Sequence, residues 1–223
     1  MSRSIRIPII VVVLGAVLAL LAVPALRSVP SVEAAGGTRE NRQAFHDGMR
    51  KLWEDHITWT RLFIVSKATL PDDLPDIGPT VDRLLQNQTD LGNAIAPFYG
   101  ADAGADLGAL LRVHILTAAD VVTAAKAGDT DALNAAKDAW YANAHDIAVF
   151  LHELNPRHWP LSDLDAMMKE HLDLTLAEAV ARLEGRYADD IARYEQVHLQ
   201  ILKMADMLSG GIIRQFPDAF AGG

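Results

Sequence analysis

Three histidines recur at nearly equal spacing, and each one is the last residue of a similar five-residue motif. The motifs LWEDH, LLRVH and MMKEH end at His56, His114 and His171, so the histidines are 58 and 57 residues apart. Imidazole is a common ligand of transition metals and a common partner of carboxylates. A fixed period of this length also predicts a repeated structural unit.

An aspartate follows each of these histidines at a comparable position, namely Asp90, Asp146 and Asp206. If each repeat is a helical hairpin that turns near residue 73, 130 or 188, its histidine and its aspartate lie at the same height. A carboxylate bonded to one imidazole nitrogen fixes the tautomer and leaves the other nitrogen free for a metal. The spacing therefore predicts three level pairs: His56 with Asp90, His114 with Asp146, and His171 with Asp206.

The third hairpin carries two further candidate ligands. Glu178 follows His171 by seven residues and His198 precedes Asp206 by eight, so each lies on the same helix face as its neighbour. Together the four side chains would form two layers, which favours this hairpin as the chemical one. The alternative is a polar, solvated groove between its two helices.

The types of these side chains limit the metals and cofactors to consider. Imidazole and carboxylate ligands suit zinc, copper(II), iron or manganese. Haem b held by two facing imidazoles is a less favoured alternative. The chain has no cysteine, which excludes zinc-thiolate sites, iron–sulfur clusters and covalent haem attachment.

Three functions from different classes remain open at this point. The first is transition-metal binding between helices, as a buffer, carrier or sensor. The second is a structural or interaction module in which His–Asp pairs only fix the register of the helices. The third is a metalloenzyme of unknown reaction, although the sequence does not favour an enzyme. The spacing leaves open whether the three hairpins share one site.

Helical periodicity dominates the chain after residue 36, and no segment shows the alternation of a strand. The predicted helices cover about 40–68, 78–97, 102–127, 131–154, 162–183 and 186 to beyond 207. We expect an all-α antiparallel bundle of about six helices, built from three degenerate αα-hairpins. A four-helix bundle with two appended helices is the alternative topology.

The N-terminus has the layout of an export signal. Arg3 and Arg6 precede an apolar run over residues 7–23, and small residues follow up to residue 35. Residues 1–35 are therefore a signal peptide or an uncleaved membrane anchor, and residues 36–223 form one extracytoplasmic domain. The expected location is extracellular or in the cell envelope. The formal net charge of −9 opposes nucleic-acid binding and suits a protein that meets cations.

Two stretches resemble a known family. LWEDH followed by Trp59-Thr60-Arg61, and the segment 204–217 with MADMLS, GII and QFP, are similar to an uncharacterised family of exported helical proteins of Gram-positive bacteria. The resemblance covers about residues 50 to 217. Members carry labels such as glycosyltransferase or acetylglutamate kinase, which no motif of this chain supports. The resemblance implies export and a helical fold, and no activity.

Overall fold

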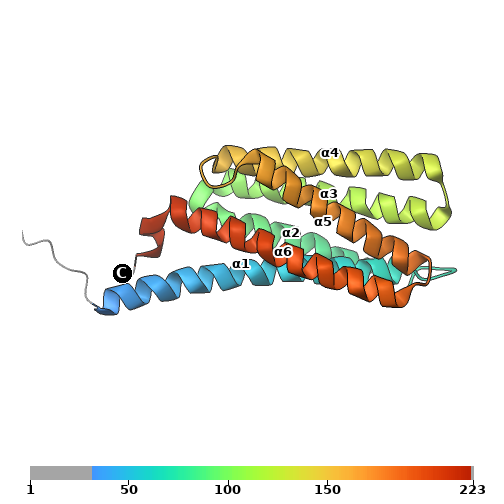
Figure 1. The fold of residues 1–223 in the computed structure, drawn as a ribbon, viewed down its shortest axis with the longest axis horizontal. Coiled ribbons are helices and arrows are strands. Elements are labelled where there is room, and N and C mark those ends of the chain that lie inside the picture. The colour runs from blue at the N-terminus through green and yellow to red at the C-terminus, as the bar shows by residue number, and fades with distance from the viewer. Residues whose placement is uncertain (1–31, 222–223) are drawn as a thin grey trace, which may run out of the picture. The chain divides into compact units, whose positions relative to one another are not determined.

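The computed structural model describes residues 32–221, which form six α-helices and one short 3₁₀ helix, with no strand among them. The predicted all-α class is confirmed. The elements are α1 Val32–Lys67, α2 Ile77–Tyr99, α3 Ala101–Ala127, α4 Thr130–Leu154, α5 Leu161–Leu183, α6 Tyr187–Gln215 and η1 Pro217–Phe220 (Figure 1). The segment 1–31, which holds most of the predicted signal or anchor, lies outside the described residues.

The turn between α3 and α4 shows how local sequence sets the helix ends. Gly128 has a φ of 69°, a left-handed conformation that favours glycine, and it closes α3. The Asp129 carboxylate then accepts a hydrogen bond of 3.0 Å from the backbone N–H of Ala132, which caps α4. The two arms of this hairpin are therefore fixed at the turn near residue 130.

α5 begins at Leu161, directly after Pro160, and the Ser162 hydroxyl donates to Asp163. α6 runs through Gly210 and Gly211 and ends at Gln215. Gly211 lies directly against the Trp159 ring, so the missing side chain makes room for the indole.

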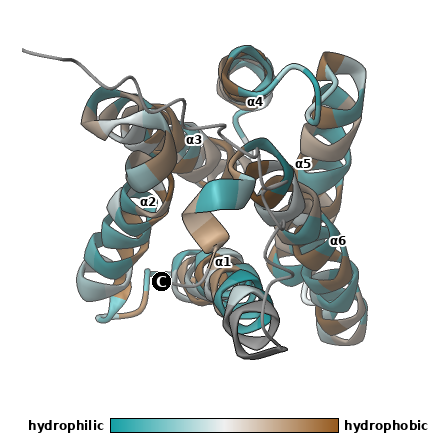
Figure 2. Ribbon diagram, turned by 90° about the vertical axis from the view of Figure 1, so that its left-hand side faces the viewer, coloured by the Kyte–Doolittle hydropathy of each residue, from teal (hydrophilic) through white to brown (hydrophobic). Residues whose placement is uncertain are grey.

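The helices form a closed ring in chain order. Each helix contacts the next, and α6 contacts α1 (Figure 2). The helices α1, α3 and α5 also contact one another, so these three line the centre of the bundle. Each hairpin therefore has an inner and an outer helix: α1 with α2, α3 with α4, and α5 with α6.

The ring is held by a large apolar core, by a second, smaller apolar cluster and by one very close helix contact. The core includes Trp53, Trp140 and Trp159, all nearly fully buried. A Cβ atom on Gly92 of α2 would lie 2.2 Å from the backbone oxygen of Gly104 on α3, so the two backbones touch. By length and composition alone α3 could cross a membrane, and here it packs against α2 and α4.

Candidate functional site

The three repeating histidines lie together at the centre of the bundle. His56 comes from α1, His114 from α3 and His171 from α5, and their exposed fractions are 2%, 3% and 5%. The ring centroids of His56 and His171 are 5.8 Å apart, and those of His114 and His171 are 6.3 Å apart. The spacing left open whether the three hairpins share one site, and in the structure their histidines lie side by side in the core.

In the second hairpin an asparagine of the outer helix holds the imidazole. Nδ1 of His114 is 3.1 Å from Oδ1 of Asn143, and the amide nitrogen of Asn143 donates to the carbonyl of Leu110 at 3.2 Å. Leu110 is one helical turn before His114. The amide therefore binds the imidazole and the backbone of the same helix at once, which fixes the register of α3 against α4.

The third hairpin repeats this arrangement with a longer amide. Nδ1 of His171 is 3.2 Å from Oε1 of Gln200, and the Gln200 amide nitrogen donates to the carbonyl of Met167 at 2.9 Å. Met167 again precedes its histidine by four residues. The clamp is thus the same in both hairpins.

The first hairpin divides the clamp between two neighbouring side chains. Nδ1 of His56 is 3.3 Å from Oε1 of Gln88, while the amide nitrogen of Asn87 donates to the carbonyl of Leu52 at 3.0 Å. Gln88 Nε2 bonds Oδ1 of Asn87 at 3.1 Å, which joins the two halves. We call the three histidines with the amides Gln88, Asn143 and Gln200 the imidazole layer.

The amide partners determine the protonation of the imidazoles. An amide oxygen only accepts, so each Nδ1 carries a proton and each neutral ring has its lone pair on Nε2. Burial lowers the pKa of His114 to about 3 and that of His171 to about 4. Burial, with the other two imidazoles, lowers the pKa of His56 well below its usual value. All three rings are therefore neutral at physiological pH.

Two buried indoles next to this layer have unsatisfied N–H groups. The Trp53 ring is 5.7 Å from that of His56, and the Trp140 ring is 5.6 Å from that of His114, centroid to centroid. Nε1 of both tryptophans is buried without a hydrogen-bond partner. Buried donors of this kind are rare and call for an explanation such as water or a ligand.

A small cavity lies one helical turn beyond the imidazole layer. It measures about 20 Å³ and is lined by Thr60, Ala118 and Thr175, each of which follows one of the three histidines by four residues, and by Trp140. The hydroxyls of Thr60 and Thr175 donate to the carbonyls of the histidines before them, both at 2.8 Å. The volume would hold one water molecule, but the accessible surface of the cavity is apolar, and apolar cavities stay dry.

A second buried polar group lies two turns along α5 from His171. Glu178 and Asp190 are 1% and 0% exposed, and both bind Arg61 of α1. The Arg61 guanidinium reaches Glu178 at 2.9 Å and bonds Asp190 through both terminal nitrogens. Burial raises the pKa of Glu178 to about 7 against the opposing effect of Arg61. We call Arg61, Glu178 and Asp190 the ionic layer.

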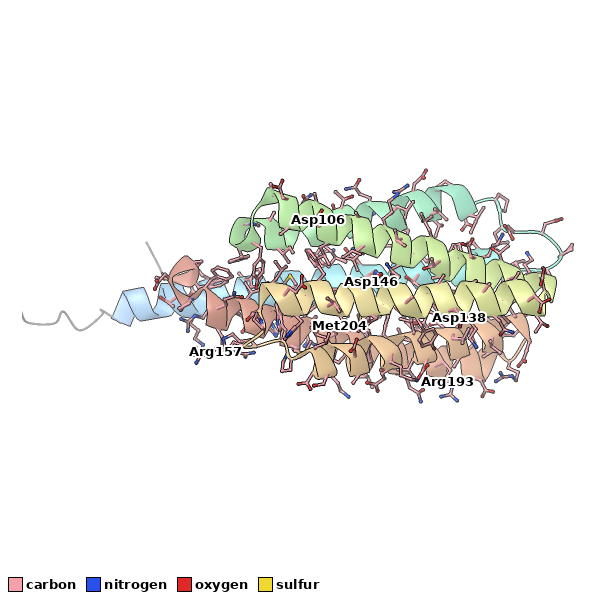
Figure 3. All side chains as sticks on the ribbon, turned by 90° about the horizontal axis from the view of Figure 1, so that it is seen from above. Asp106, Asp138, Asp146, Arg157, Arg193 and Met204 are labelled. Carbon is pink, nitrogen blue, oxygen red and sulfur yellow. The ribbon has the colours of Figure 1, made fainter. Side chains whose placement is uncertain are left out.

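The predicted aspartate partners of the first two histidines are wrong. Asp90 lies at the surface, where it accepts from Gln86 at 3.0 Å and faces Arg83 at 3.5 Å. Asp146, labelled on α4 in Figure 3, is exposed. Counting residues from the turn fixed the height of each side chain but not the face of the helix it occupies.

Of the four side chains predicted to form two layers in the third hairpin, only His171 and Glu178 are buried. Asp206 is exposed and binds Arg50 at 2.6 Å and His46 at 2.9 Å. His198 is partly exposed and bonds Glu54 of α1 at 2.7 Å. Neither side chain is among the bonded partners of His171 or Glu178.

The sequence contained a signal for the true partners. Gln88 lies between the buried residues Leu84 and Leu91 on the apolar stripe of α2. Gln200 lies between the buried residues Val197 and Met204 on the apolar stripe of α6. An amide on an apolar stripe indicates a buried partner. Asn143 follows the same rule on α4.

Residues 32–221 contain no group of three His, Cys, Asp or Glu side chains already arranged as a metal shell. No protein-family model matches the chain, and neither a curated protein nor a solved structure matches it.

Proposed function

We propose that this protein binds one transition-metal ion through the Nε2 atoms of His56, His114 and His171, as a buffer, carrier or sensor. The observation that carries the proposal is the convergence of three buried, neutral imidazoles from three different helices. In each of them the amide clamp uses Nδ1, so the nitrogen that remains is the one with the lone pair. Hydrogen-bonded partners of this kind orient histidine ligands in metal sites.

The spacing of the rings suits a shared ion. A metal about 2.0 to 2.1 Å from each Nε2 places pairs of ring centroids roughly 5 to 6 Å apart. The centroid distances of 5.8 Å and 6.3 Å are close to this range. Among the described residues these side chains are not a ready-made ligand set, so binding requires the rings to move toward one another.

The carboxylates that we first expected as ligands are not part of this proposed site. Imidazole ligands alone still suit zinc, copper and iron, while manganese prefers oxygen ligands. Haem b needs far more space than the cavities of about 20 and 10 Å³ near the layer offer. We therefore favour a bare ion over a porphyrin.

Metal analysis of the purified protein tests this proposal. We expect about one zinc, copper or iron ion per chain, or a rise in melting temperature when one of these ions is added to metal-free protein. The variant His114→Ala should lose the ion, while His145→Ala, whose side chain is 58% exposed, should retain it. Absence of bound metal and of any thermal shift with all three ions would overturn the proposal.

A structural role is the second candidate, and the completeness of the clamps favours it. Each amide satisfies an imidazole and a backbone carbonyl, so the layer is stable without a ligand. In that case the histidines specify register alone, and the metal experiment gives a negative result. A melting temperature unaffected by metals, together with a large loss of stability on substitution, would identify this role.

We also propose that the protein is exported, as a secreted or membrane-tethered form. The support is the basic start, the apolar residues 7–23 and the small residues that follow. Fractionation of cells that produce the full chain tests it. Protein confined to the cytoplasm would contradict export, and the mass of exported protein would tell whether the signal is removed.

A further inference from the structure

We infer that Glu178 is the proton-exchanging counter-charge for a cation bound by His56, His114 and His171, so that ion binding releases a proton from Glu178. The inference rests on the proposed function and goes beyond it, because it adds a residue that touches no metal. It also predicts that metal affinity depends on pH in a range where the imidazoles themselves do not titrate.

The charge of the proposed metal site requires a negative group nearby. The ligands are three neutral imidazoles held by neutral amides, so a bound ion would bring its full positive charge into the core. An uncompensated buried charge is very unfavourable. A carboxylate inside the same core is the group that can balance it, and Glu178 and Asp190 are the buried acids of the described chain.

Glu178 lies on the same face of α5 as His171, one layer away. His171, Thr175 and Glu178 follow one another at four and three residues on a single face of α5, so they form a column. Seven residues of helix place Glu178 roughly 10 Å from the level of His171. The cavity of about 20 Å³, which Thr175 and Ala179 help to line, lies between the two layers. The accessible surface of this cavity is apolar, so little screens a charge at the histidines from one at Glu178.

The charged groups around Glu178 stabilise its carboxylate less than that of Asp190. From α1 it faces Arg61 at 2.9 Å, and from α6 it faces Asp190, which shares the same guanidinium. Tyr194 lies against Arg61, and Arg182 of α5 reaches Asp190 at 3.6 Å. Among the described residues no charged group of α3 or α4 is paired with Glu178. Asp190 thus has two arginines, whereas Glu178 shares only one.

These surroundings make Glu178 easier to protonate than an ordinary glutamate. Burial raises its pKa to about 7, which is the range in which a modest change of local charge moves a proton. When a cation binds, the Glu178 carboxylic acid loses one proton to solvent and becomes a carboxylate. No bond other than this O–H bond breaks, and no electron is transferred. The Arg61 side chain, which bonds Glu178, is 16% exposed, so the Glu178 carboxyl lies close to solvent.

The size of the effect follows from the distance. A negative charge about 10 Å from a monovalent cation, in protein of effective dielectric 20, raises the affinity for that cation roughly tenfold. For a divalent cation the interaction energy doubles, so the affinity rises roughly a hundredfold. For zinc we therefore expect a measurable release of up to one proton near pH 7, because binding drives Glu178 to the ionised form. Zinc affinity should rise roughly tenfold between pH 6 and pH 8 and then level off.

Calorimetric titration of the protein with zinc chloride tests the inference. The observed heat is measured at pH 7 in three buffers of different ionisation enthalpy, and the slope gives the number of protons released. Glu178→Gln keeps an acceptor for Arg61 but has no proton to lose, so it should bind zinc with almost no proton release. Glu184→Gln, at an exposed carboxylate after the end of α5, should behave like wild type.

The outcomes separate this inference from the proposed function. If wild type does not bind zinc, both fail for that ion. If wild type and Glu178→Gln bind zinc and release the same number of protons, the inference is overturned and the metal site stands. If Glu178→Gln does not fold, the pH profile of wild-type affinity decides: the tenfold rise supports the inference, and a flat profile from pH 6 to pH 8 overturns it.

Discussion

The imidazole layer and the ionic layer lie about two helical turns apart in one core, yet they satisfy their polar groups in opposite ways. In the first, burial keeps the histidines neutral and the outer helices supply uncharged amides. In the second, the Arg61 guanidinium is held between two buried acids, Glu178 and Asp190, and its charge is satisfied by pairing. The first layer leaves three Nε2 atoms available, whereas the second uses most of its hydrogen-bonding capacity internally.

The comparison teaches where ligand binding and stability should be sought. A layer with unused lone pairs can accept an ion without losing the contacts that hold it together. A layer of paired charges is a stability element, because removing one partner leaves an uncompensated charge in the core. Substitutions in each layer, a steric substitution elsewhere and a pH series test this difference between the two layers.

The largest effect should come from breaking the ionic layer. Asp190→Ala leaves Arg61 with one carboxylate, and a broken buried ion pair costs about 3–5 kcal/mol of unfolding free energy. Urea denaturation followed by circular dichroism measures it. Asp189→Ala is the matched control, because its neighbouring carboxylate is 61% exposed and pairs only with Arg186. Equal effects of the two substitutions would contradict the assigned role of the ionic layer.

The imidazole layer should be somewhat less sensitive. His114→Ala creates a cavity and leaves the Asn143 carbonyl oxygen without its partner, so we expect a loss of about 2–4 kcal/mol. In the double variant His114→Leu with Asn143→Leu, both polar partners are replaced by apolar groups. That pair should lose less stability than the sum of its single changes, which a double-mutant cycle measures. Strict additivity would mean that the two side chains are not coupled.

A purely steric defect gives the baseline for both layers. In Gly211→Ala the new Cβ atom would lie 2.0 Å from Nε1 of Trp159, whose ring is buried, so we expect a loss of about 1–3 kcal/mol. In Gly210→Ala the new Cβ atom would meet only the flexible end of Arg214 at 3.2 Å. Higher helix propensity should make that neighbour neutral or slightly stabilising. Thermal melts of the two variants compare them directly.

The share of one histidine in the pH dependence of stability is the smallest and most specific test. The pKa values of the three imidazoles are lower in the folded protein than in the unfolded chain, so the unfolded state binds more protons below pH 6.5. Their contribution to stability is complete above pH 6.5 and is lost as the pH falls toward 4. Each imidazole should contribute about 1.4 kcal/mol per pH unit between these limits. His114→Ala should reduce the slope of unfolding free energy against pH by that amount between pH 6 and pH 5; an unchanged slope would show that His114 is not buried as neutral imidazole.

The sequence predicted the helices and the buried histidines because both follow from helical periodicity. It failed for the partners because height along a hairpin does not specify direction around a helix. Asp90 is two residues after Gln88, and two residues turn about 200° around the helix, which moves the side chain from the core to the surface. Energetics point the same way, since a neutral amide is cheaper to bury beside a neutral imidazole than a carboxylate is. Asp190 was missed because it lies outside the repeating spacing altogether.

The contact of α6 with α1 has a consequence for how such a protein can change. Stacked repeat proteins are open at both ends and grow by the addition of further units. Here the last unit meets the first, so the number of hairpins is set at three by the closure of the circle. Duplicating a hairpin would not lengthen the molecule but would force a wider circle, which would pull the central side chains apart. A circular permutant that begins at the α2–α3 or the α4–α5 connection keeps every contact of the circle, and it should fold.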